Sequence, residues 1–209
     1  MTYDSNTGNR KGLPQRRSIR LKGYDYSQAG AYFITICCHD RICRFGEIVG
    51  AGLAPALFAP THNDDTENLQ SSNNQPQNIK GQPQGIAPTM HLNEYGQIAC
   101  NEWVKLPEQY PNFELDVFQI MPNHMHGIIV LSDVGAGIAP TIGDIVGAYK
   151  SLVANGCLTI FKKNNKKMGQ LWQRDYYEHI IRDDQSYQTI SNYIIDNPVK
   201  WADDKFYIT

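Results

Sequence analysis

The chain has 209 residues, of which 41% are hydrophobic and 19% charged, and its formal net charge is −2. This composition is typical of a globular domain and excludes a fibrous or wholly disordered protein. The sequence has no apolar run of the roughly 18 residues that span a bilayer and no apolar segment of a signal peptide, so we expect a cytoplasmic protein without a membrane partner. Five cysteines without paired CxxC spacing indicate neither a disulfide framework nor a cysteine zinc site.

The chain is strongly basic ahead of its first predicted strand. Residues 10–22 contain no acidic residue and six basic ones, namely Arg10, Lys11, Arg16, Arg17, Arg20 and Lys22. Such a cluster fits a solvated tail, and it also fits a segment that binds the phosphates of a nucleic acid. The slightly negative net charge of the whole chain argues weakly against a polyanionic partner, but a net charge averages over regions that can do different things.

Two strands and a low-complexity segment follow. Residues 31–39 (AYFITICCH) are rich in aromatic and β-branched side chains, and residues 44–49 (RFGEIV) form the predicted hairpin partner. Residues 50–91 contain a long stretch that is poor in apolar residues and rich in Asn, Gln and Pro. We therefore expect residues 50–91 to be a disordered loop insertion in a single domain that spans residues 1–209.

A helix and two strands are predicted next. In residues 92–111, Ile98, Trp103 and Leu106 have near-helical spacing, and Pro107 marks the expected end of the helix. Residues 113–131 then predict two consecutive strands, because two apolar runs are separated by a break near Pro122.

Two further helices complete the predicted order of elements. Residues 141–163 predict a helix whose apolar stripe consists of Ile145, Ala148, Tyr149 and Leu152. A last helix is predicted over residues 186–201, with Asp183 or Asp184 as its N-cap and Pro198 at its end. The order strand, strand, helix, strand, strand, helix predicts an α+β fold, with an antiparallel sheet, helices mainly on one face and an additional C-terminal helix.

Two histidines stand at the start of the strand in MPNHMHGIIVL. Side chains two residues apart in a strand point to the same face, so His124 and His126 present their rings side by side. The apolar residues after them indicate that this face is covered, and buried imidazoles need partners. Hydrogen bonds to neighbours and coordination of a divalent metal ion both meet that need, and two histidines are too few for a closed zinc site.

A third ligand and a reacting group are best sought in the C-terminal helix. Tyr193 and Asn197 are four residues apart and therefore lie on the same side of that helix. A phenol becomes a nucleophile when a metal ion or a base favours its phenolate, and an amide oxygen can join a metal site without adding charge. The alternative is that Tyr193 is a partly buried aromatic residue and Asn197 a helix-ending residue.

These residues together resemble a known family. PNHMHGIIVL (122–131) and SNYIIDNPVKW (191–201) are similar to the two active-site segments of IS200-like single-tyrosine HUH transposases, most closely of the branch associated with repetitive extragenic palindromes. RRSIRLKGYDYSQAGAYFITICCHDRICRFGEI (16–48) resembles the N-terminal signature of that family, and LWQRDYYEHIIR (171–182) resembles the segment before the catalytic helix.

The resemblance implies a ferredoxin-like or RRM-like fold and a metal-dependent reaction on DNA. It implies that His124, His126 and Asn197 bind Mg²⁺ or Mn²⁺, and that Tyr193 attacks single-stranded DNA to give a 5′-phosphotyrosine link. Under this hypothesis the phosphates contact basic residues of the N-terminal segment, namely Arg16, Arg17, Arg20 and Lys22. The expected partner is single-stranded DNA with hairpin or palindromic ends, bound by a bacterial, nucleoid-associated monomer or homodimer.

Two other functions stay open at this point. One is a non-catalytic RRM-like module that stacks nucleobases on Tyr32 and Phe33, although the sequence has no RRM signature. The other is a metal-dependent phosphodiesterase that uses water in place of Tyr193. His179, in YYEHIIR, is expected to pack or to hydrogen-bond, with contact to DNA as the alternative.

Overall fold

The fold is built on a four-stranded antiparallel sheet with the strand order β4-β5-β1-β6. Its strands are β1 (Gly30–Cys37), β4 (Phe113–Ile120), β5 (His124–Leu131) and β6 (Tyr177–Ile181). The structure is a computed structural model that describes residues 23–50, 88–110, 112–133 and 140–207. The basic residues Arg16, Arg17, Arg20 and Lys22 lie outside the described residues.

A two-stranded antiparallel sheet and three helices complete the fold. The small sheet pairs β2 (Gly46–Val49) with β3 (Thr89–Leu92). The helices are α1 (Glu94–Gln109), α2 (Ile142–Lys163) and α3 (Asp184–Asp196), and two short 3₁₀ helices occupy His39–Arg41 and Trp201–Asp203. None of the helices in the described ranges is both long and apolar enough to cross a membrane.

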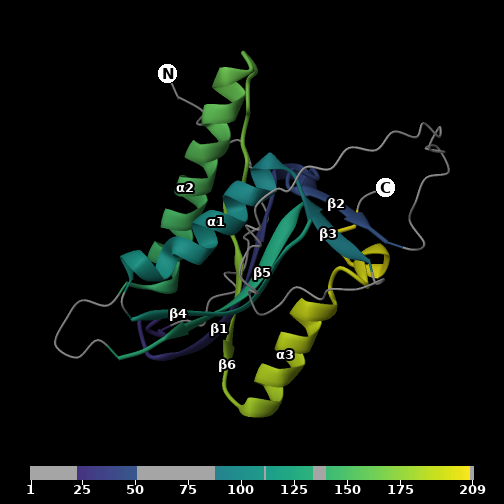
Figure 1. The fold of residues 1–209 in the computed structure, drawn as a ribbon. Coiled ribbons are helices and arrows are strands. Elements are labelled where there is room, and N and C mark those ends of the chain that lie inside the picture. The colour runs from purple at the N-terminus through teal and green to yellow at the C-terminus, as the bar shows by residue number, and fades with distance from the viewer. Residues whose placement is uncertain (1–22, 51–87, 111, 134–139, 208–209) are drawn as a thin grey trace, which may run out of the picture.

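The helices lie on both faces of the four-stranded sheet. Figure 1 shows α1 and α2 together on one side and α3 on the other. Alternation along β5 divides its side chains between the two faces: Met125 and Ile129 belong to the large core under α1 and α2, whereas Ile128 packs in a smaller cluster with Ile194 of α3. This arrangement confirms the predicted α+β fold with a separate C-terminal helix.

Each helix begins at a side chain that satisfies its free backbone N–H groups. The side chain of Asn93 accepts hydrogen bonds at the start of α1, and Thr141 forms a capping box with Asp144 at the start of α2. Asp183 accepts a hydrogen bond from the backbone N–H of Ser186, so of the two predicted caps it is Asp183 that begins α3.

The helix ends and stripes depart from the prediction in two places. Helix α1 continues through Pro107 to Gln109, because a proline in the last turn costs one hydrogen bond while the N–H of Tyr110 still reaches the carbonyl of Leu106. In α2 the fully buried stripe includes Val146 and Val153, whereas Ala148 and Leu152 are only half-buried.

Two strands were not predicted from the sequence. Strand β3 lies inside residues 50–91, so the predicted insertion extended too far toward its C-terminal end, and residues 51–87 lie outside the described residues. Strand β6 is five residues long and carries Glu178 on its buried side, opposite Ile34. Because this charged residue stands at a buried position, the sequence of β6 lacks the alternation of apolar and polar residues that predicts a half-buried strand.

Gly127 lets the large core close against the histidine-bearing strand. A β-carbon at Gly127 would lie 2.9 Å from a ring carbon of Trp103, which is fully buried on α1. At Gly147, in the middle of α2, a β-carbon would meet no atom of the described residues within 4 Å.

The same substitution at these two glycines should therefore have opposite effects. Gly127→Ala should lower the free energy of unfolding by about 1–3 kcal/mol, because the Trp103 ring must shift in a packed core. Gly147→Ala should raise it by about 0.5–1 kcal/mol, because alanine favours an exposed helical position. Urea unfolding followed by circular dichroism measures both, and equal effects at the two positions would contradict the packing described.

Candidate functional site

His124 and His126 lie in the middle of the sheet with their rings on the α3 face. In the register of the sheet, His124 is opposite Cys37, and His126 is opposite Thr35 on one side and Gln119 on the other. The two histidines are 0% and 1% exposed. Their Nε2 atoms are 3.0 Å apart, as the shared face of the strand predicts.

The hydrogen bonds of Asn123 determine which nitrogen of His124 carries the proton. The side-chain Nδ2 of Asn123 donates to the carbonyls of Arg41 and Phe206, at 2.9 and 2.8 Å. The Oδ1 atom of Asn123 therefore faces Nδ1 of His124, 2.9 Å away, and can only accept. Nδ1 of His124 carries the proton, and its Nε2 presents a lone pair toward His126.

His126 can adopt either tautomer because its second partner is a hydroxyl. Its Nδ1 lies 2.8 Å from Oγ1 of Thr35, which can donate or accept. With the proton on Nε2, His126 donates to the lone pair of His124. With the proton on Nδ1, His126 donates to Thr35 and both Nε2 lone pairs are free to bind a cation.

Burial keeps both imidazoles uncharged at neutral pH. It lowers the pKa of His126 to about 3, and the ammonium group of Lys205 contributes in the same direction. It also lowers the pKa of His124 well below its ordinary value, with further contributions from His126, Lys205 and Arg41. Neutral imidazole is the form that binds metal ions, so the pair is ready to do so at neutral pH.

Tyr193 approaches the histidines from α3. Its hydroxyl oxygen lies 3.2 Å from Nε2 of His126, and its side chain is 37% exposed. The ring also makes an edge contact with Phe33, which in turn stacks on His126. Burial and the carboxylate of Asp204 raise the pKa of Tyr193, and a hydrogen bond with the Asn197 side chain lowers it, so the phenol is protonated without a further positive charge beside it.

Asn197 caps the C-terminus of α3, one turn beyond Tyr193. Its Nδ2 donates to Oδ2 of Asp204 at 3.1 Å. Its Oδ1 is buried and has no hydrogen-bond partner among the described residues. A buried acceptor without a donor is costly, which makes this oxygen a suitable ligand for a cation.

Asp204 and Phe206 reach the site from the C-terminal segment, and the sequence did not single out either residue. Ligand atoms of His124, His126 and Asp204 all lie within 4.8 Å of one another. The ring of Phe206 covers His124 at a centroid distance of 4.5 Å. Arg41 holds this segment by donating to the carbonyl of Lys205 at 2.9 Å.

The donor set fits a divalent cation. Two imidazole lone pairs and the Asp204 carboxylate lie together, the Asn197 amide is hydrogen-bonded to that carboxylate, and each of these groups is a ligand type that such ions accept in proteins. The structure thus brings together all four residues that the sequence proposed for this site, His124, His126, Tyr193 and Asn197.

Other sequence-based expectations are not met. Tyr32 is fully buried, and its hydroxyl donates to the carbonyl of Gln28, so it offers no ring to a nucleobase. His179 is exposed on β6, and none of the described residues forms a hydrogen bond with its ring, so the expected packing or hydrogen-bonding role was wrong. Thr35 and Asn123 were missed, although Asn123 directly precedes the histidine pair.

The chain is similar to known proteins in sequence. Residues 92–197, about half of the chain, match the family model described as "Transposase IS200 like". An uncharacterized protein of Haemophilus influenzae is 35% identical over 214 aligned residues, which cover 94% of this chain and 96% of that protein. A second H. influenzae protein, named "Putative REP-associated tyrosine transposase", is 34% identical over 112 residues, which cover 53% of this chain and 62% of that protein.

The fold is also similar to that of a solved structure. The structure of a REP-associated tyrosine transposase bound to a REP hairpin superposes with a TM-score of 0.50 at 18% sequence identity, covering 89% of this chain and 76% of that one. The likeness extends over most of the described elements and concerns the fold.

The neutral histidines should make the metal-free protein sensitive to acid. A folded-state pKa of about 3 for His126 lies below the ordinary value of 6.5, so between these values the unfolded chain binds the extra proton and stability falls as pH falls. In EDTA, the free energy of unfolding should drop by about 1 kcal/mol per buried histidine between about pH 6.5 and about pH 5.5. His126→Gln should show a shallower slope in urea titrations, and parallel slopes would contradict the burial of a neutral imidazole.

Proposed function

Because the chain belongs to the family of IS200-like transposases, we propose that it cuts and rejoins single-stranded DNA with Tyr193 as the nucleophile. The observation that carries this proposal is the position of the Tyr193 hydroxyl, 3.2 Å from Nε2 of His126 in a buried pair of neutral histidines. No other exposed tyrosine of the described residues has its hydroxyl hydrogen-bonded to either histidine.

Three side chains would hold a divalent cation, Mg²⁺ or Mn²⁺. These are His124 and His126 through Nε2 and Asn197 through Oδ1, the acceptor without a partner. Bound there, such an ion would polarise a phosphate and lower the pKa of the nearby phenol. Asp204 holds the amide of Asn197 in place by accepting from its Nδ2, and its carboxylate would be a further ligand for such an ion.

The reaction exchanges one phosphoester bond for another. The oxygen of Tyr193 bonds to phosphorus, the bond between phosphorus and the 3′ oxygen breaks, and the phenol proton ends on the released 3′-hydroxyl. The product is a 5′-phosphotyrosine link and a free 3′-OH. Rejoining runs in the opposite direction with the 3′-OH of another strand, and the retained phosphoester makes an energy source unnecessary.

The proposed substrate is single-stranded DNA that carries a hairpin. A relative of known structure was solved with a REP hairpin, which supports this class of partner. Arg16, Arg17, Arg20 and Lys22 would contact phosphates, because charge neutralisation supplies most sequence-independent affinity for DNA. The Phe206 ring lies against His124 and the Tyr193 ring lies against His126, so both histidines are closed to solvent in this conformation.

Tyr193→Phe should abolish the covalent adduct while leaving DNA binding nearly unchanged, because it removes only the attacking oxygen. A hairpin-bearing single strand with a 3′ label is incubated with protein and Mn²⁺, and the label is followed to the protein band in denaturing electrophoresis. Tyr187→Phe, on the same helix, is the matched control and should keep full activity. Cutting by the native protein without an adduct would favour a phosphodiesterase that uses water.

Thr35→Val should weaken the binding of Mn²⁺ by about 10- to 100-fold, as expected when the partner of a ligating histidine is removed. Valine keeps the shape of threonine but cannot accept a hydrogen bond from Nδ1–H of His126, so the tautomer that frees Nε2 loses its partner. Calorimetric titration measures the affinity. Thr159→Val, on the exposed side of α2, serves as the control, and equal affinities in the two variants would exclude this role for Thr35.

A further inference from the structure

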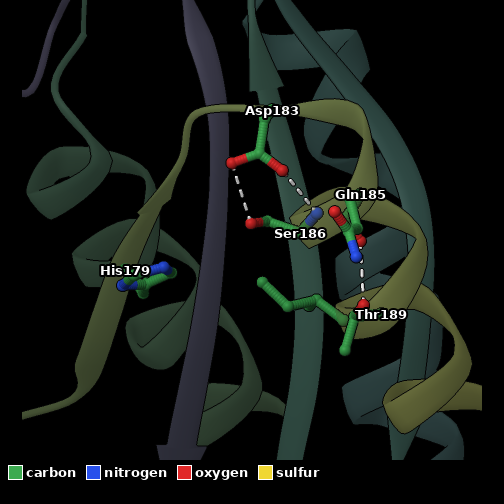
Figure 2. A pocket seen from close by; sticks show the side chains of 6 residues that line it. His179, Asp183, Gln185, Ser186 and Thr189 are labelled. Carbon is green, nitrogen blue, oxygen red and sulfur yellow. Dashed lines mark hydrogen bonds between the residues drawn. The ribbon is translucent and has the colours of Figure 1, made fainter.

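A cavity of about 460 Å³ that is open to solvent lies between β6 and the first half of α3, and its lining includes neither histidine of the pair. Its walls are formed by six residues: His179, Asp183, Gln185, Ser186, Thr189 and Ile190. Figure 2 shows His179 on β6 facing the residues at the start of α3 across this space. Because His179 is opposite Phe33, whose ring stacks on His126, the cavity opens on the same face of the sheet as the histidine pair.

Some polar groups of the cavity are already satisfied by one another. The carboxylate of Asp183 accepts from the backbone N–H and the hydroxyl of Ser186, at 2.7 and 3.0 Å. The hydroxyl of Thr189 donates to the carbonyl of Gln185 at 2.8 Å. Among the described residues, none hydrogen-bonds to the ring of His179 or to the side-chain amide of Gln185. An aromatic ring and an amide are therefore left for a ligand.

The chemistry of the lining favours a nucleobase over a phosphate. The lining contains no lysine or arginine, and the carboxylate of Asp183 repels an anion. An imidazole ring can stack on a base, an amide can both donate to and accept from a base edge, and the side chain of Ile190 supplies apolar contact. These groups recognise a flat, uncharged ring that has hydrogen-bonding groups on its edge.

Exposed aromatic rings connect the cavity with Tyr193. Tyr177, two residues before His179 on β6, is 41% exposed. Its ring lies 6.1 Å from that of Phe33, and the ring of Tyr193 lies 6.2 Å from the same Phe33 ring. Thr189 is one helical turn from Tyr193, about 6 Å along the axis of α3. A strand with its phosphate at Tyr193 can therefore place a nearby base in the cavity.

We propose that this cavity binds one nucleobase of the single strand that flanks the phosphate attacked by Tyr193. His179 stacks on the base, Gln185 pairs with its edge, and Tyr177 supports the strand between the cavity and the nucleophile. This assignment rests on the proposed function for its substrate, and it makes His179 and Gln185 residues that determine the sequence preference of cutting.

Binding without cutting tests the stacking role. A fluorescein-labelled hairpin with single-stranded flanks is titrated in EDTA, and the anisotropy gives Kd. His179→Ala should raise Kd by about 5-fold to about 100-fold, the usual effect of losing one base–aromatic contact, and His179→Phe should restore it. His91→Ala, at an exposed histidine on β3, is the matched control and should bind like the native protein.

Cutting tests the pairing role. Three proteins are compared: the native protein, Gln185→Ala and the control Gln188→Ala, which changes a residue of α3 outside the cavity. Each is incubated with Mn²⁺ and hairpin-bearing strands whose flanks have random sequence. The DNA in the covalent adducts is then sequenced. Gln185→Ala should lose a base preference at one flanking position that the other two proteins retain. If no protein forms an adduct but His179→Ala still binds weakly, the base site stands and the proposed function fails. If the affinities and the preferences match the native ones, the base site is wrong.

Discussion

Two neutral imidazoles whose Nε2 atoms are 3.0 Å apart are the constraint on which the site depends. Protonation of both rings would place two positive charges in contact inside the sheet, so burial and mutual repulsion keep the pair neutral. Asn123 fixes the proton of His124 on the far nitrogen, and the hydroxyl of Thr35 accommodates either tautomer of His126. Without a cation, His126 can therefore donate a hydrogen bond from Nε2 to His124. With its proton on Nδ1 instead, the pair can offer both Nε2 lone pairs to a cation.

The sheet has two unlike faces, and this division lets the fold bury a polar histidine pair while other residues supply its stability. One face carries the large core under α1 and α2, and the rings of Trp103 and Tyr149 are fully buried there. The other face needs only the small cluster around Ile128 and Ile194 to hold α3. The remainder of that face is free for polar groups, and the helix that closes it also carries Tyr193 and Asn197.

In the two proposals, the same helix carries the residues of the reaction near its end and those of base recognition near its beginning. Helix α3 presents Tyr193 and Asn197 near its C-terminus, beside the histidines, and Gln185 and Thr189 near its N-terminus, beside β6. A rigid helix fixes the spacing between these groups, so a DNA strand bound as proposed at one end of the helix would be positioned at the other. Strand β6 also contributes side chains to this face. It lies at the edge of the four-stranded sheet, and no further strand of the described residues pairs with its outer edge.

Local sequence determined the parts of the site that depend on short-range geometry. The two-residue period of a strand placed His124 beside His126, and the near-four-residue turn of a helix placed Tyr193 beside Asn197. Tertiary structure alone decided which residues meet these pairs. Thr35 reaches His126 through a register between strands 91 residues apart, and Asp204 arrives on a segment after the last helix. The cavity at His179 depends on β6, whose buried Glu178 conceals the strand pattern. Pairings of this kind are set by long-range packing, which no local period encodes.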